Sequence, residues 1–123
     1  AFTVADTAIA GRYGEALVSL RHAIASGADP VPLVAAIASK LRTMARVYGV
    51  RESSSALAAR LGLKDWQVDR ARRDLAGWDE AALQIAVQAA ARADAEVKGA
   101  SRDAVFAVER LVTVIATRAP FGD

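Results

Sequence analysis

The 123-residue sequence has no cysteine and a single histidine. Disulfides and thiolate metal sites are therefore excluded, and no second imidazole exists to share a metal ion with His22. Only three prolines occur, and alanine, which costs the least free energy to fix in a helix, is frequent. This scarcity of helix breakers favours an all-helical protein.

Signatures of catalysis are also absent. The chain contains no glycine-rich phosphate loop and no nucleophile elbow. No apolar run approaches the roughly 18 residues of a membrane span. The 16 basic and 14 acidic residues leave a net charge of +2, too small an excess to favour nucleic-acid binding by itself. We therefore predict no catalytic residue, no cofactor, no metal, no small-molecule substrate and no membrane contact.

Hydrophobic residues recur at helical spacing along the whole chain, and no stretch alternates with the period of a strand. Thr3 with Asp6 resembles a capping box, and Asp29 before Pro30 predicts a capped helix start. The expected architecture is all-α, one irregular bundle of about six or seven helices forming a single domain over residues 1–123. We expect helices over 4–10, 12–26, 30–48, 65–76 and 79–99, and a last helix capped by Ser101. After a linker or cap at residues 53–55, a short helix is expected through Leu57 and Leu61 to Gly62.

The segment 79–99 is apolar nearly all round for three turns, which predicts a helix in the middle of the bundle. Gly99 is expected to end it in the left-handed conformation. The helical repeat returns Asp94 to the apolar face, so we predict a buried carboxylate with a structural ion pair to Lys98. Glu96 is expected on the surface.

Residues 53–75 have the pattern of a helix-turn-helix. Small Ala58 permits a close helix crossing, Gly62 makes the turn, and Val68 anchors the second helix. Three aspartates in this second helix would oppose contact with phosphates. The side chains able to contact DNA in this alternative are Gln67, Arg70 and Arg73.

Two tryptophans flank the same predicted helix, and two interpretations of each remain open. Trp66 and Trp78 are either core aromatics whose indole N–H finds a partner, or subunit contacts, since tryptophan is enriched at interfaces. The candidate subunit contacts are Trp66, Arg70, Arg73 and Trp78.

Short motifs occur in a characteristic order along nearly the whole chain. They are Phe2-Thr3-Val4 with Asp6 and Ala8, Ala16-Leu17, Gly27-Ala28-Asp29-Pro30, Leu41-Arg42, Trp66-Gln67-Val68 through Trp78, Ala93-Asp94 with Lys98-Gly99, and Glu109-Arg110-Leu111. Together they resemble the C-terminal domain of the delta subunit of bacterial DNA polymerase III, part of the clamp loader.

The resemblance implies a non-catalytic collar domain that packs with the gamma/tau and delta prime subunits into a closed ring. It also implies that the sliding clamp and DNA are reached through the parent complex, a nucleotidyltransferase of the bacterial cytoplasm. The chain is accordingly expected to be part of a longer subunit. The alternative is a small helix-turn-helix DNA-binding regulator using residues 53–75, and the small basic excess favours the assembly domain.

Overall fold

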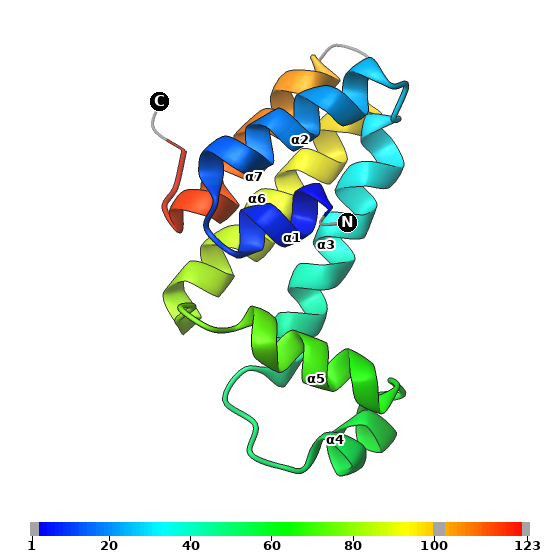
Figure 1. The fold of residues 1–123 in the computed structure, drawn as a ribbon, viewed down its shortest axis with the longest axis vertical. Coiled ribbons are helices and arrows are strands. Elements are labelled where there is room, and N and C mark those ends of the chain that lie inside the picture. Colours follow the sequence, from blue (N-terminus) through cyan, green and yellow to red (C-terminus); the bar gives the residue numbers. More distant parts are fainter. Residues whose placement is uncertain (1–2, 100–102, 122–123) are drawn as a thin grey trace.

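The computed structural model describes residues 3–99 and 103–121, and within these ranges it contains seven helices and no strand. The prediction of an all-α bundle of six or seven helices is confirmed. The helices are α1 (Val4–Ile9), α2 (Tyr13–Ala25), α3 (Pro30–Val47), α4 (Ser54–Leu61), α5 (Asp65–Asp74), α6 (Glu80–Lys98) and α7 (Ala104–Thr117) (Figure 1).

Local capping signals explain most helix starts. The backbone N–H of Asp6 donates to Thr3 Oγ1 and the N–H of Thr3 donates to Asp6 Oδ2, both at 3.1 Å, so the predicted capping box forms. Asp29 caps α3 through the N–H of Val31 at 2.9 Å, and Asp79 caps α6. These carboxylates satisfy N–H groups that lack partners within the helix.

Two predicted helix boundaries need comment. Gly99 has φ −85° and ψ 139°, so the prediction of a left-handed stop is wrong: α6 ends in extended backbone. The predicted cap Ser101 lies outside the described residues. Asp103 caps α7, accepting a hydrogen bond from the N–H of Phe106 at 3.1 Å. An aspartate so close to the predicted serine offers the same capping chemistry.

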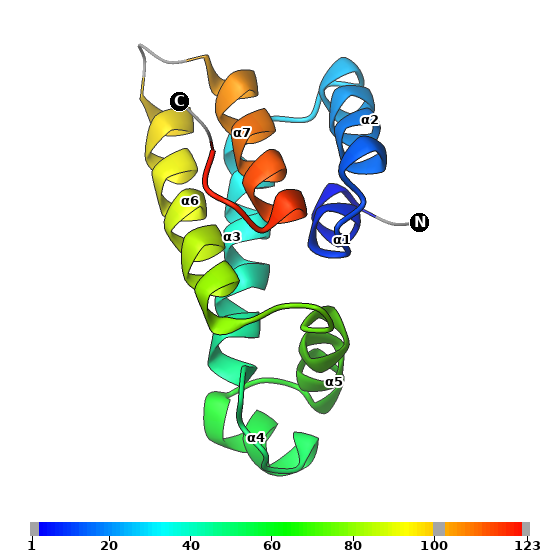
Figure 2. The ribbon, with the colours of Figure 1, turned by 90° about the vertical axis from the view of Figure 1, so that its left-hand side faces the viewer.

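Helices α3, α6 and α7 run in alternating directions and form the centre of the bundle (Figure 2). The short α1 and the longer α2 pack on the side of α7 away from α6, while α4 and α5 lie together at one end. The largest fully buried side chains come from every helix except α6: Ile9, Leu20, Val34, Ile37, Leu41, Met44, Val47, Leu57, Val68, Val108, Leu111 and Ile115.

Helix α6 contributes mostly alanine to the core, and only one broad face of it is buried. The prediction that this helix lies in the middle of the bundle and not on its surface is wrong for one side of it, where Gln84, Gln88 and Ala91 are exposed. Alanine carries little apolar area, so leaving it in water costs little while helix propensity is kept. The buried stripe is Ala82, Leu83, Ala86, Ala90, Ala93 and Val97. Across residues 3–99 and 103–121, no helix has the length and apolar character to span a bilayer.

Candidate subunit interface

One outward stripe of α5 carries three of the predicted site residues. Trp66, Arg70 and Arg73 are spaced four and three residues apart, which places them on one side of the helix. The Trp66 side chain is 64% exposed. Arg73 is also exposed, and its guanidinium forms no hydrogen bond or ion pair with any residue that the structure describes. An indole and a guanidinium are thus both free to contact a partner.

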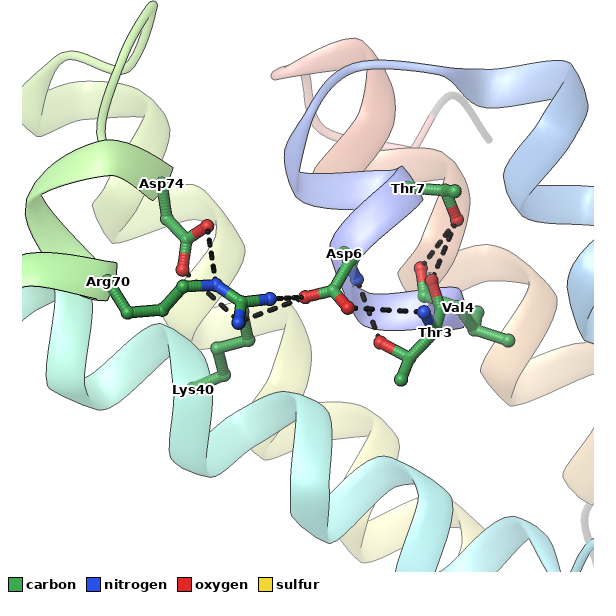
Figure 3. Close-up of polar contacts among 7 residues, drawn as sticks. All are labelled: Thr3, Val4, Asp6, Thr7, Lys40, Arg70 and Asp74. Atoms are coloured by element: carbon green, nitrogen blue, oxygen red, sulfur yellow. Dashed lines mark hydrogen bonds and ion pairs between the residues drawn. The ribbon is translucent and has the colours of Figure 1, made fainter. Parts of the chain in front are cut away.

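Arg70, in contrast, belongs to a charge cluster where α1, α3 and α5 meet (Figure 3). Its Nη2 donates to Asp6 Oδ1 at 2.6 Å, and its Nε lies 3.6 Å from Asp74 Oδ1. Lys40 Nζ lies 3.0 Å from Asp6 and 3.2 Å from Asp74. Two acids and two bases therefore alternate in space, and sequence reasoning missed the cluster because Asp6 and Arg70 are 64 residues apart.

The two carboxylates are the least exposed members of this charge cluster, at 12% for Asp6 and 15% for Asp74. Burial raises the pKa of Asp6, but hydrogen bonds from Lys40 and from Thr3 lower this pKa by more than burial raises it. The pKa of Asp6 therefore lies well below its usual value. Asp6 therefore stays ionised at neutral pH and serves both the α1 cap and the cluster.

Grooves flank the charge cluster on both sides. A groove of about 1140 Å³ lies toward α1, and a smaller one of about 330 Å³ lies between α3 and α5 beside Trp66. Both are lined by Ala36, Lys40, Arg70 and Asp74, so they form one furrow that the cluster crosses. Arg73 lines the larger groove and Trp66 the smaller one.

Trp78 is a core residue of the domain, so its assignment as a candidate subunit contact is wrong. Its side chain is 7% exposed, and its indole N–H donates to the carbonyl of Ile9 at 3.1 Å. The guanidinium carbon of Arg118 lies 3.8 Å from the centroid of the ring. The two interpretations left open for each tryptophan thus have different outcomes: Trp66 is exposed, whereas Trp78 is buried in the core.

Arg118 was not singled out from the sequence, yet it joins the ends of α1 and α7. It donates to the carbonyls of Ala8 at 3.3 Å, Ile9 at 2.5 Å and Ile115 at 2.8 Å. These groups include carbonyls at the end of α1, which have no partner within the helix. Arg118 itself has φ 58°, unusual for a residue with a side chain. Burial lowers the pKa of its guanidinium.

The α4–α5 pair does have the predicted turn, with Gly62 left-handed at φ 71°. Leu57, Ala58 and Val68 are buried, as the pattern predicts. However, Gln67 Oε1 accepts the N–H of Lys64 at 2.8 Å, so this side chain caps its own helix. With Gln67 and Arg70 bound within the domain, Arg73 is the predicted DNA contact that keeps its donors available.

The ion pairs of α6 differ from the predicted pattern. Lys98 Nζ lies 2.9 Å from Asp94 Oδ2, but these side chains are 58% and 35% exposed. The prediction that Asp94 is the buried acid and Glu96 the surface one is wrong. Glu96 and its partner Arg110 on α7 are both only 12% exposed. Arg92 Nε adds a longer contact of 3.6 Å to Glu96.

Comparison with known protein families decides between the two functional classes. The family described as DNA polymerase III delta subunit, C-terminal domain, matches residues 1–115. The chain belongs to this family. Searches of curated proteins and of solved structures found no match.

Membership makes the chain a delta C-terminal domain, a non-catalytic domain of a clamp-loader subunit that associates with other loader subunits. The matched range includes the α5 stripe, the charge cluster and Trp78, whereas Arg118 lies beyond it. No group of three or more His, Asp or Glu positioned for a metal ion occurs among the described residues.

Proposed function

We propose that this delta C-terminal domain is an assembly module, which packs against the helical domains of the gamma/tau and delta prime subunits in a ring that supports loading of the sliding clamp. Trp66 carries the proposal: it is a 64% exposed indole, beside a groove, within the matched range. Large aromatic side chains dominate the energetics of interfaces when a partner buries them. The domain over residues 1–123 thus supplies contacts with other subunits and takes no part in catalysis.

Binding of the other loader subunits to a Trp66→Ala variant tests this surface. We expect the variant to bind at least about tenfold more weakly than the wild type, because an interface tryptophan commonly contributes more than about 1.4 kcal/mol. Surface plasmon resonance with the purified partner subunits measures the affinity. Thermal unfolding should change by little, since Trp66 makes few contacts of its own.

Val18→Ala provides a matched control on another face of the bundle. Val18 on α2 is 67% exposed, so its removal also deletes an exposed apolar side chain. Affinity should be retained in this variant if α5 forms the contact. Loss of binding with Val18→Ala and not with Trp66→Ala would move the interface to α2 and contradict the assignment.

A second candidate function, direct contact with DNA, is favoured by one observation. Residues 40–74, which include α4 and α5, contain nine lysines and arginines and four aspartates and glutamates, whereas the whole chain has an excess of only two. The basic excess is therefore concentrated at one end of the domain. Such a region can contact phosphates without reading sequence.

Arg73→Ala tests this second function. If Arg73 contacts a phosphate, its removal should weaken DNA binding several-fold and lower the slope of log affinity against log salt by about one. Fluorescence anisotropy with labelled duplex and single-stranded DNA measures both quantities. Arg21→Ala, an exposed arginine on α2, is the control. If the two substitutions had equal effects, DNA would be attracted by the overall charge of the domain and not by a surface at Arg73, which would contradict this function.

A further inference from the structure

The end of the domain formed by α4 and α5 is a unit with its own boundaries. We call residues 50–76 the arm. The chain enters it after Gly49 and leaves it before Gly77, whose φ values are 74° and 81°. Glycine adopts this left-handed region without the steric penalty that side chains impose. A backbone hydrogen bond spans each joint, from the Val50 N–H to the Val47 carbonyl at 3.1 Å and from the Trp78 N–H to the Leu75 carbonyl at 3.0 Å. Figures 1 and 2 show the arm at one end of the bundle.

Contacts within the arm tie it together. Arg72 donates to the carbonyls of Val50 at 3.1 Å and Glu52 at 2.5 Å, and to Ser54 Oγ at 2.9 Å. Ser54 Oγ in turn donates to Asp69 Oδ1 at 2.5 Å. These bonds join the loop before α4 to α5. The arm can therefore move as one body rather than unravel residue by residue.

The arm is attached to the rest of the domain through α3 and α1. Its packing partner is α3, and the furrow described above opens the seam on both sides of the charge cluster. The contact with α1 is made by Arg70 of the arm and Asp6. Asp74 of the arm pairs with Lys40 of α3. Two charge pairs thus cross the seam, together with a hydrogen bond from Arg46 Nη2 of α3 to the carbonyl of Leu61 at 3.1 Å. Beneath these polar contacts, the buried Val68 and Ala71 of the arm pack in the common core.

We propose that the charge cluster is an electrostatic latch, and that the arm opens from the bundle as a unit about Gly49 and Gly77 when its pairs break. Arg70 is 41% exposed, so dissolved ions reach the latch and weaken it. Opening reorients the α5 stripe with Trp66 and Arg73, while α6 and α7 keep their mutual packing. The latch thereby sets the position of the exposed tryptophan relative to the core.

Hydrogen exchange of the 123-residue chain, followed by mass spectrometry, tests the latch. In Arg70→Gln we expect amides of residues 54–74 to exchange about tenfold faster or more. Losing a part-buried ion pair costs more free energy than losing an exposed one. Amides of α6 and α7 should stay within about twofold of the wild type. Raising salt from about 0.05 to about 0.5 M should accelerate the same arm amides in the wild type and much less in Arg70→Gln.

Two further variants keep the test decisive. Asp6→Asn should also accelerate exchange in the arm, because it removes the other half of the same charge pair. If Asp6→Asn fails to fold, Arg70→Gln still tests the latch, since it leaves the α1 capping box intact. Asp94→Asn breaks a Lys–Asp pair confined to α6 and should leave arm exchange unchanged. Equal acceleration in all helices would mean that the cluster supports only global stability, and unchanged arm exchange would mean that it holds nothing closed. Either result overturns the proposal.

Discussion

Glu96→Ala is expected to lower the free energy of unfolding by roughly 2–4 kcal/mol, because it removes the carboxylate from a largely buried ion pair with Arg110. Glu96 and Arg110 are each 12% exposed and join α6 to α7. Urea unfolding followed by circular dichroism measures the change.

Asp94→Ala is the matched control for this prediction, since it removes a carboxylate from the same helix two residues away. Asp94 and Lys98 are 35% and 58% exposed, so the expected loss is under about 1 kcal/mol. A loss from Asp94→Ala as large as that from Glu96→Ala would contradict the assignment of Glu96 and Arg110 as the pair that matters for stability.

Trp78→Ala is expected to have the larger effect of the two, a loss of roughly 3–5 kcal/mol. The substitution removes a side chain that is 7% exposed, leaves the Ile9 carbonyl without one donor, and removes the ring against which Arg118 stacks. Urea unfolding again provides the measurement.

Two variants separate the causes of this loss. Trp78→Phe keeps most of the ring volume but deletes the hydrogen bond to Ile9, and should cost about 1 kcal/mol. Trp66→Ala removes an exposed indole and should cost under about 0.5 kcal/mol. If the two tryptophan-to-alanine variants were equally stable, the distinction between a core Trp78 and an exposed Trp66 would be wrong.

Local features of the fold could be predicted from the sequence because their causes are local. The Thr3–Asp6 capping box, the Asp29–Pro30 helix start and the turn at Gly62 each depend on residues within a few positions of one another. The family resemblance rests on the same kind of short motif, and it too is confirmed.

The relative burial of Asp94 and Glu96 could not be predicted from such local patterns. Both lie at the edges of the buried stripe of α6, about 200° apart around the helix. The edge with Val87 faces α3, and the edge with Ala89 faces α7. Periodicity locates the stripe but does not reveal which edge a neighbouring helix covers. Here α7 brings Arg110 to Glu96, whereas Asp94 remains half in water.

The candidate site was harder still to predict, because its partners are distant in the sequence. The α5 stripe of Trp66, Arg70 and Arg73 follows from helical spacing. That Arg70 is bound to Asp6, 64 residues earlier, does not. Trp78 and Arg118 likewise meet the end of α1 from 69 and 109 residues away, and no spacing rule connects such positions.

The contacts at the end of α1 also bear on the order in which the chain matures on the ribosome. The carbonyl of Ile9 is bound by Trp78 and by Arg118, which are synthesised 69 and 109 residues after it. Until Arg118 is synthesised, α1 can pack on α2 and α3 and pair with Arg70 of α5, but the surface that α7 covers stays open to water. In the chain, α1 precedes the other six helices that the structure describes, yet it is among the last to gain all its contacts, because non-local contacts form slowly.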